Sequence, residues 1–64
     1  MEKWKLALLY FPDSPAATGM RRLRRWIRNN RPLSQELERV GSNRNAKMYN
    51  KRELGLIYEY LGEP

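Results

Sequence analysis

Arginine is the residue type in this sequence whose number and spacing point to chemistry. Five arginines stand between residues 20 and 29, namely Arg21, Arg22, Arg24, Arg25 and Arg28, and Arg31 follows closely. At about 100° per residue on a helix, Arg21, Arg24, Arg25 and Arg28 fall within an arc of roughly 100°. A planar guanidinium group can donate two parallel hydrogen bonds to a phosphate or to a guanine edge. The pattern therefore predicts a helix face that binds anions.

The charge balance of the chain agrees with an anionic partner. The net charge is +6, with eight basic and two acidic side chains in residues 1–32 and five of each in residues 33–64. The alternative is a helix face that only contacts water, as most charged surfaces do. Such a face normally carries carboxylates at i,i+4 positions, but only Asp13 lies between Glu2 and Glu36. The repulsion between the arginines is therefore not offset by neighbouring carboxylates, which favours a role in binding an anionic partner.

Nucleic acid is the partner that this distribution favours, and DNA more than RNA. The expected role is that of a small regulator or an accessory of DNA-handling proteins. We expect primary phosphate contacts from Arg21, Arg24, Arg25 and Arg28, and further contacts from Arg22, Arg31, Arg44 and Lys47.

A second class of function uses the same arginine face to dock an acidic protein. Leu56 and Tyr60 could then form a homodimer surface, or they could instead pack against the first helix. Attachment to a membrane is not expected, because Met20, Leu23 and Ile27 are needed for the core and leave little apolar surface for lipid.

Catalysis is not expected, because the residue types that it needs are missing. The sequence contains no cysteine, no histidine and no glycine-rich phosphate-binding loop. Glu36 and Glu38 would diverge on a helix. We expect no catalytic residues, no metal and no cofactor. The apolar run over residues 6–11 is too short to span a bilayer and unlike a secretory signal, so the expected location is the cytoplasm.

Four apolar segments predict a single all-α domain over residues 1–64, a compact bundle of about four short helices. Residues 3–11 are assigned to a helix, although a buried strand has the same apolar pattern. Ser14 is expected to cap a second helix that begins at Pro15 and runs to about Asn30. Gly19 should weaken that helix by about 1 kcal/mol relative to alanine.

The second half of the chain carries clearer signals for where helices begin and end. A helix is predicted over about residues 33–40 with Gly41 as its stop, followed by a polar loop at residues 42–49 that could extend as a small wing. Asn50 and Glu53 predict a capping box for the last helix. Gly62 should end that helix.

Parts of the sequence resemble known families. Residues 5–10 (KLALLY), 14–15 (SP) and 23–27 (LRRWI) are similar to the opening of MerR-like and excisionase-like winged helix domains, and residues 49–57 (YNKRELGLI) to the segment after their wing. That resemblance implies a helix-turn-helix unit whose second helix enters the DNA major groove. Over its whole length the chain also resembles a family of short gut-bacterial proteins described as a domain of unknown function. The residues that carry this likeness are LALLYFP at 6–12, RRWI at 24–27 and the closing EYLGEP at 59–64.

Overall fold

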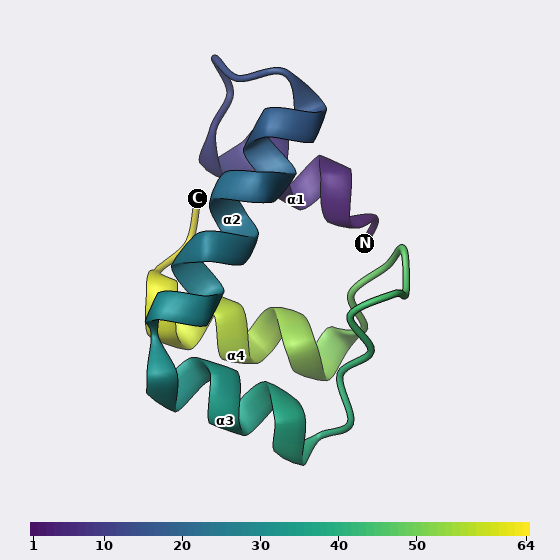
Figure 1. Cartoon of the computed structure of the whole chain (residues 1–64), viewed down its shortest axis with the longest axis vertical. Coiled ribbons are helices and arrows are strands. Elements are labelled where there is room, and N and C mark those ends of the chain that lie inside the picture. Colours follow the sequence, from purple (N-terminus) through teal and green to yellow (C-terminus); the bar gives the residue numbers. More distant parts are fainter.

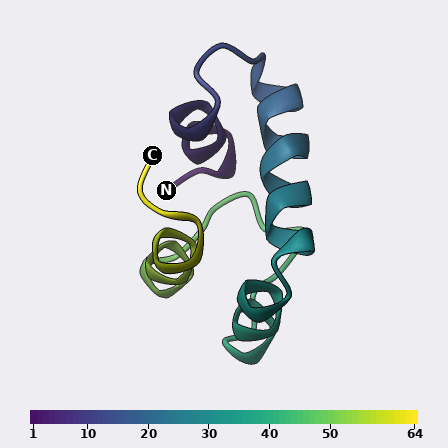
Figure 2. The ribbon, with the colours of Figure 1, turned by 90° about the vertical axis from the view of Figure 1, so that its left-hand side faces the viewer.

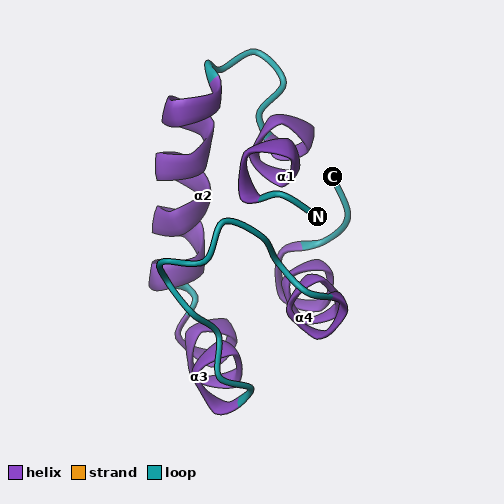
Figure 3. Cartoon of the chain, turned by 90° about the vertical axis from the view of Figure 1, so that its right-hand side faces the viewer, coloured by secondary structure: helices purple, strands orange, loops and turns teal.

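The apolar segments of the sequence form four helices in the computed structural model, which describes residues 1–64. The helices are α1 (Lys3–Tyr10), α2 (Ala16–Asn29), α3 (Arg31–Arg39) and α4 (Lys51–Leu61). The long helix α2 follows the long axis of the molecule, and α1, α4 and α3 cross it one below the other (Figures 1 and 2). There is no strand, so the all-α fold expected from the sequence is confirmed (Figure 3).

Packing against α2 explains why the first segment is a helix. One side of α1 buries Leu6 and Ala7 against the core, and Phe11 is buried directly after the helix. The backbone of α2 comes close to Ala7 at Gly19, where an added Cβ atom would lie 3.5 Å from the Cβ atom of Ala7. Trp4, which shares the helical spacing of Ala7, is 43% exposed and does not belong to the core.

Replacing Gly19 with alanine is expected to stabilise the protein. The new Cβ atom would meet Ala7 at an ordinary van der Waals distance, and alanine costs less conformational entropy in a helix by about 0.5–1 kcal/mol. For a domain of this size we expect the melting temperature, followed by far-UV circular dichroism, to rise by roughly 3–6 °C.

The matched control is Gly55→Ala in α4, where an added Cβ atom meets nothing within 4 Å. The same gain in helix propensity should raise the melting temperature there as well. A melting temperature that rises for Gly55→Ala but falls for Gly19→Ala would show that α1 and α2 need the bare backbone.

The start of α2 differs from the sequence prediction. The helix begins at Ala16, with Pro15 in extended conformation as the residue before it and without a side-chain cap. The carbonyl oxygen of Pro15 accepts a hydrogen bond from the N–H of Gly19 at 2.8 Å. The predicted cap at Ser14 was wrong, because its hydroxyl oxygen instead accepts a hydrogen bond from Nη1 of Arg22 at 3.1 Å.

A single residue, Asn30, connects α2 to α3. Its N–H donates to the carbonyl oxygens of Trp26 and Ile27 at the end of α2. Its side-chain oxygen accepts from the N–H of Leu33 at 3.1 Å, which caps the start of α3. The third helix therefore begins at Arg31, two residues before the predicted start, since proline is tolerated in a first helical turn.

The predicted ends of α3 and α4 are confirmed. Gly41 and Gly62 have φ angles of 77° and 86°, the left-handed region that favours glycine after a helix. At the start of α4 both hydrogen bonds of the capping box between Asn50 and Glu53 are present. Residues 42–49 form a loop whose only β-type pairing is an isolated antiparallel bridge between Glu2 and Met48, so no two-stranded wing forms.

One core holds the helices together. The buried residues from all four helices and the two neighbouring segments are Leu6, Ala7, Phe11, Leu23, Leu33, Leu37, Tyr49 and Ile57. Leu56 is partly buried and packs against this core, whereas Tyr60 remains 38% exposed. Of the two residues considered for a homodimer surface, Tyr60 is the more exposed.

Candidate functional site

The arginines of α2 stand on an unbroken helix and are exposed. Leu23 and Gly19 are buried on the opposite side of this helix. This burial fixes how α2 is rotated, because only one orientation places Leu23 in the core. This orientation leaves the following arginine side chains of α2 exposed: Arg21, Arg22, Arg24, Arg25 and Arg28.

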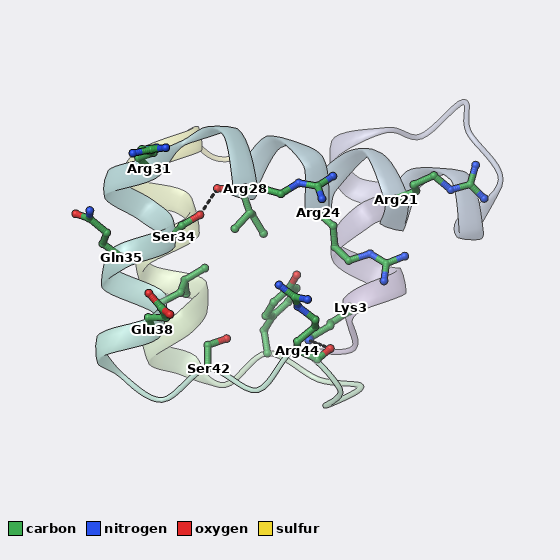
Figure 4. A pocket seen from close by; sticks show the side chains of 13 residues that line it. Lys3, Arg21, Arg24, Arg28, Arg31, Ser34, Gln35, Glu38, Ser42 and Arg44 are labelled. Atoms are coloured by element: carbon green, nitrogen blue, oxygen red, sulfur yellow. Dashed lines mark hydrogen bonds between the residues drawn. The ribbon is translucent and has the colours of Figure 1, made fainter.

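A hollow of about 710 Å³ opens beside this helix. Its walls come from α2, from α3, from the loop after α3 and from the start of α1 (Figure 4). Six basic side chains line it, and Glu38 is the only acidic one. The basic residues are Lys3, Arg21, Arg24, Arg28, Arg31 and Arg44.

The arginines around the hollow have no anionic partner within the protein. The two ion pairs of the structure join Lys5 to Glu2 at 3.5 Å and Arg39 to Glu36 at 3.6 Å, and none of these four residues lines the hollow. No side chain of the lining arginines takes part in a hydrogen bond. Their donors therefore remain available to a ligand.

Lys3 lines the hollow and also binds the loop that follows α3. Its Nζ atom donates hydrogen bonds to the carbonyl oxygens of Asn43 at 3.1 Å and Arg44 at 3.4 Å, and it lies 5.0 Å from the ring centroid of Tyr49. Partial burial lowers the pKa of Lys3, the Glu53 carboxylate opposes this shift, and the charge of Arg24 adds to it. An anion in the hollow would relieve the repulsion between Lys3 and Arg24.

The apolar side chains that line the hollow are less exposed than its arginines and so form its deeper part, the bottom of the hollow. They are Ile27 from α2, Leu37 from α3 and Tyr49 from the residue pair before α4. Burial, followed by the nearby Glu53 carboxylate, raises the pKa of Tyr49 to about 12. Tyr49 is therefore uncharged at neutral pH and adds no negative charge beside the arginines.

Glu53 holds the loop side of the hollow in position although it does not line it. It is almost completely buried, and its Oε1 atom accepts from the N–H of Asn50 at 2.8 Å. Its Oε2 atom accepts a hydrogen bond from the hydroxyl of Ser42, which does line the hollow. One carboxylate thus connects the start of α4 to the wall that carries Arg44.

The structure brings together part of the residue set predicted from the sequence. Arg21, Arg24, Arg28, Arg31 and Arg44 line the hollow, whereas Arg22, Arg25 and Lys47 do not. The guanidinium carbon of Arg22 lies 4.4 Å from the ring centroid of Phe11, so this side chain packs against the end of α1. Arg25 and Lys47 are exposed elsewhere on the surface.

Several residues of the hollow were missed by sequence reasoning. They are Lys3, Ser34, Gln35, Glu38, Ser42 and the three apolar residues at its bottom. Lys3 was visible only as one more positive charge in the first half of the chain. Its position depends on the pairing of Glu2 with Met48, a contact that no local sequence pattern reveals.

Trp26 lies on the other side of α2 from the hollow. Its ring packs edge-on against Phe11, with centroids 4.7 Å apart, and against Tyr10, with centroids 6.2 Å apart. These contacts give Trp26 a packing role against the end of α1. The ring is nonetheless 44% exposed.

Comparison with known proteins gives a family and no ligand. None of the four helices combines the length and the apolar character required to cross a membrane. No curated protein and no solved structure matches the chain. Residues 1–64 match the family model described as "Domain of unknown function (DUF4248)". The protein is therefore a member of the DUF4248 family along its entire length.

Proposed function

We propose that this protein binds nucleic acid, with DNA as the favoured ligand, through phosphate contacts in the basic hollow. The observation that carries the proposal is the group of six basic side chains around one hollow, of which the arginines have no anionic partner. Uncompensated like charges destabilise the free protein, so a ligand that neutralises them gains that energy on binding.

The number of arginines around the hollow favours nucleic acid over an acidic protein surface as the ligand. Five of the six basic residues are arginines, whose flat donor forks match the oxygens of a phosphate. Nucleic acid also supplies phosphates at regular spacing, which allows several arginines to be neutralised together. An acidic protein would have to present several carboxylates in the same small space.

The test is a fluorescence anisotropy titration of the whole chain with labelled DNA, in single-stranded and duplex form, at several salt concentrations. If four of the lining cations each neutralise a phosphate, log K should fall with log salt at a slope of about −2.8 on a single strand and about −3.6 on a duplex. Absence of binding to both forms at low salt would refute the proposal. Binding to acidic partners that survives nuclease treatment would then identify a protein ligand.

A further inference from the structure

The basic side chains line a concave surface from several sides and do not project from one convex helix face. Arg24 and Arg28 approach it from α2, while Arg44 and Lys3 approach it from the facing loop and the start of α1 (Figure 4). A helix that inserts into a major groove presents its cations outward from one convex face. Here, the cations on the facing wall would be left without phosphates if α2 alone entered a groove.

The bottom of the hollow has a different chemistry from its rim. Ile27, Leu37 and Tyr49 lie below the charged groups, which a bare phosphate chain does not require. A volume of about 710 Å³ lies within the range of pockets that enclose one small organic molecule, roughly 300–1,000 Å³. The hollow thus offers charge at its rim for a phosphate and apolar surface below for a flat ring.

Polar groups on the α3 wall are also free for a ligand. Gln35 and Glu38 line the hollow, and neither side chain forms a hydrogen bond or an ion pair within the protein. An amide and a carboxylate are side chains that can pair with the hydrogen-bonding edge of a nucleobase. The acidic Glu38 would only repel a ligand that consists of phosphate alone.

We infer that the hollow takes one unpaired nucleotide of a DNA strand. Its phosphate lies between Arg24 and Arg28 on one side and Arg44 on the other, and its base lies over Ile27 and Leu37. This inference rests on the proposed function and narrows it, because the bases of a duplex are paired and stacked and cannot reach the bottom of the hollow. The protein is then a single-stranded DNA-binding protein.

The experiment compares three labelled probes of equal length by fluorescence anisotropy at one salt concentration, using the whole chain. The probes are a single-stranded oligonucleotide, an abasic strand with the same phosphodiester backbone, and the duplex of the first strand. Burial of a base against Ile27 and Leu37 should make the single strand bind at least about 5-fold more tightly than the abasic strand. It should also bind more tightly than the duplex, although the duplex carries twice the charge.

A second measurement follows the methyl groups by NMR during the same titrations. The methyl signals of Ile27 and Leu37 should shift with the single strand and stay in place with the abasic strand, while those of Leu54, which does not line the hollow, serve as the control. Equal affinities for all three probes would overturn the single-nucleotide inference and leave nucleic-acid binding intact. Failure of every probe to bind would refute the proposed function, and the inference with it.

Discussion

Replacing both Arg24 and Arg28 with glutamate is expected to weaken the binding of single-stranded DNA by about 100-fold or more. Both side chains line the hollow and neither has a partner in the protein. A hydrogen bond to a charged group contributes roughly 1.5–3 kcal/mol, so the loss of two such contacts alone reaches this size. Glutamate at the same positions would in addition repel phosphate. Anisotropy titration measures the affinity, and circular dichroism verifies that the helix content of the protein is unchanged.

The matched control replaces Arg25 and Arg52 with glutamate. This double variant changes the net charge by the same amount, but both residues are exposed and neither lines the hollow. We expect affinity to fall by less than about 10-fold, through the weaker overall field of the protein. If the control variant loses as much affinity as the Arg24 and Arg28 variant, binding follows net charge and the hollow is not the site.

Replacing Glu53 with alanine is expected to destabilise the fold by about 2–4 kcal/mol. The change removes the acceptor of two partly buried hydrogen bonds, from the Asn50 N–H and the Ser42 hydroxyl, and a hydrogen bond to a charged group contributes roughly 1.5–3 kcal/mol. A small core gives only about 3–5 kcal/mol of net stability, so most of it would be lost. The measurement is thermal or urea unfolding, with a melting temperature lowered by at least about 10 °C.

Glu59→Ala provides the control for this prediction. Glu59 lies on the same helix, is exposed, and makes no hydrogen bond or ion pair. Surface substitutions of this kind usually change stability by no more than about 0.5 kcal/mol. A Glu53→Ala protein that unfolds at the same temperature as Glu59→Ala would show that the loop is held by other contacts.

Structural features that depend on residues close together in the chain could be predicted from the sequence. The capping box at Asn50 and Glu53 and the stops at Gly41 and Gly62 depend only on neighbours three or four positions away, and the structure contains all of them. The helical arc of arginines likewise follows from residue spacing within one element. Local periodicity thus sufficed for the second, third and fourth helices, whereas the apolar pattern of residues 3–11 also fitted a buried strand.

Contacts between distant residues could not be read in the same way. The Nζ atom of Lys3 binds the carbonyl oxygen of Asn43, forty positions along the chain, and this contact contributes one wall of the hollow. The arc of arginines is also divided by its surroundings, since α3 and the loop lie beside Arg24 and Arg28 but not beside Arg25. A helical projection cannot show on which side of an element its neighbours will pack.

A single residue, Asn30, joins α2 to α3, so the relative position of these two walls of the hollow depends on the length of this connection. Asn30 closes α2 through its backbone N–H and caps α3 through its side-chain oxygen, so an amino acid inserted beside it would separate these two roles and shift α3 relative to α2. Ser34, whose hydroxyl now donates a hydrogen bond to the carbonyl oxygen of Ile27 at 2.6 Å, would then lose this contact with α2. Extra residues in the 42–49 loop would leave this relation unchanged. Insertions at the junction should therefore impair ligand capture by displacing α3, whereas insertions in the loop should impair it where they displace Arg44.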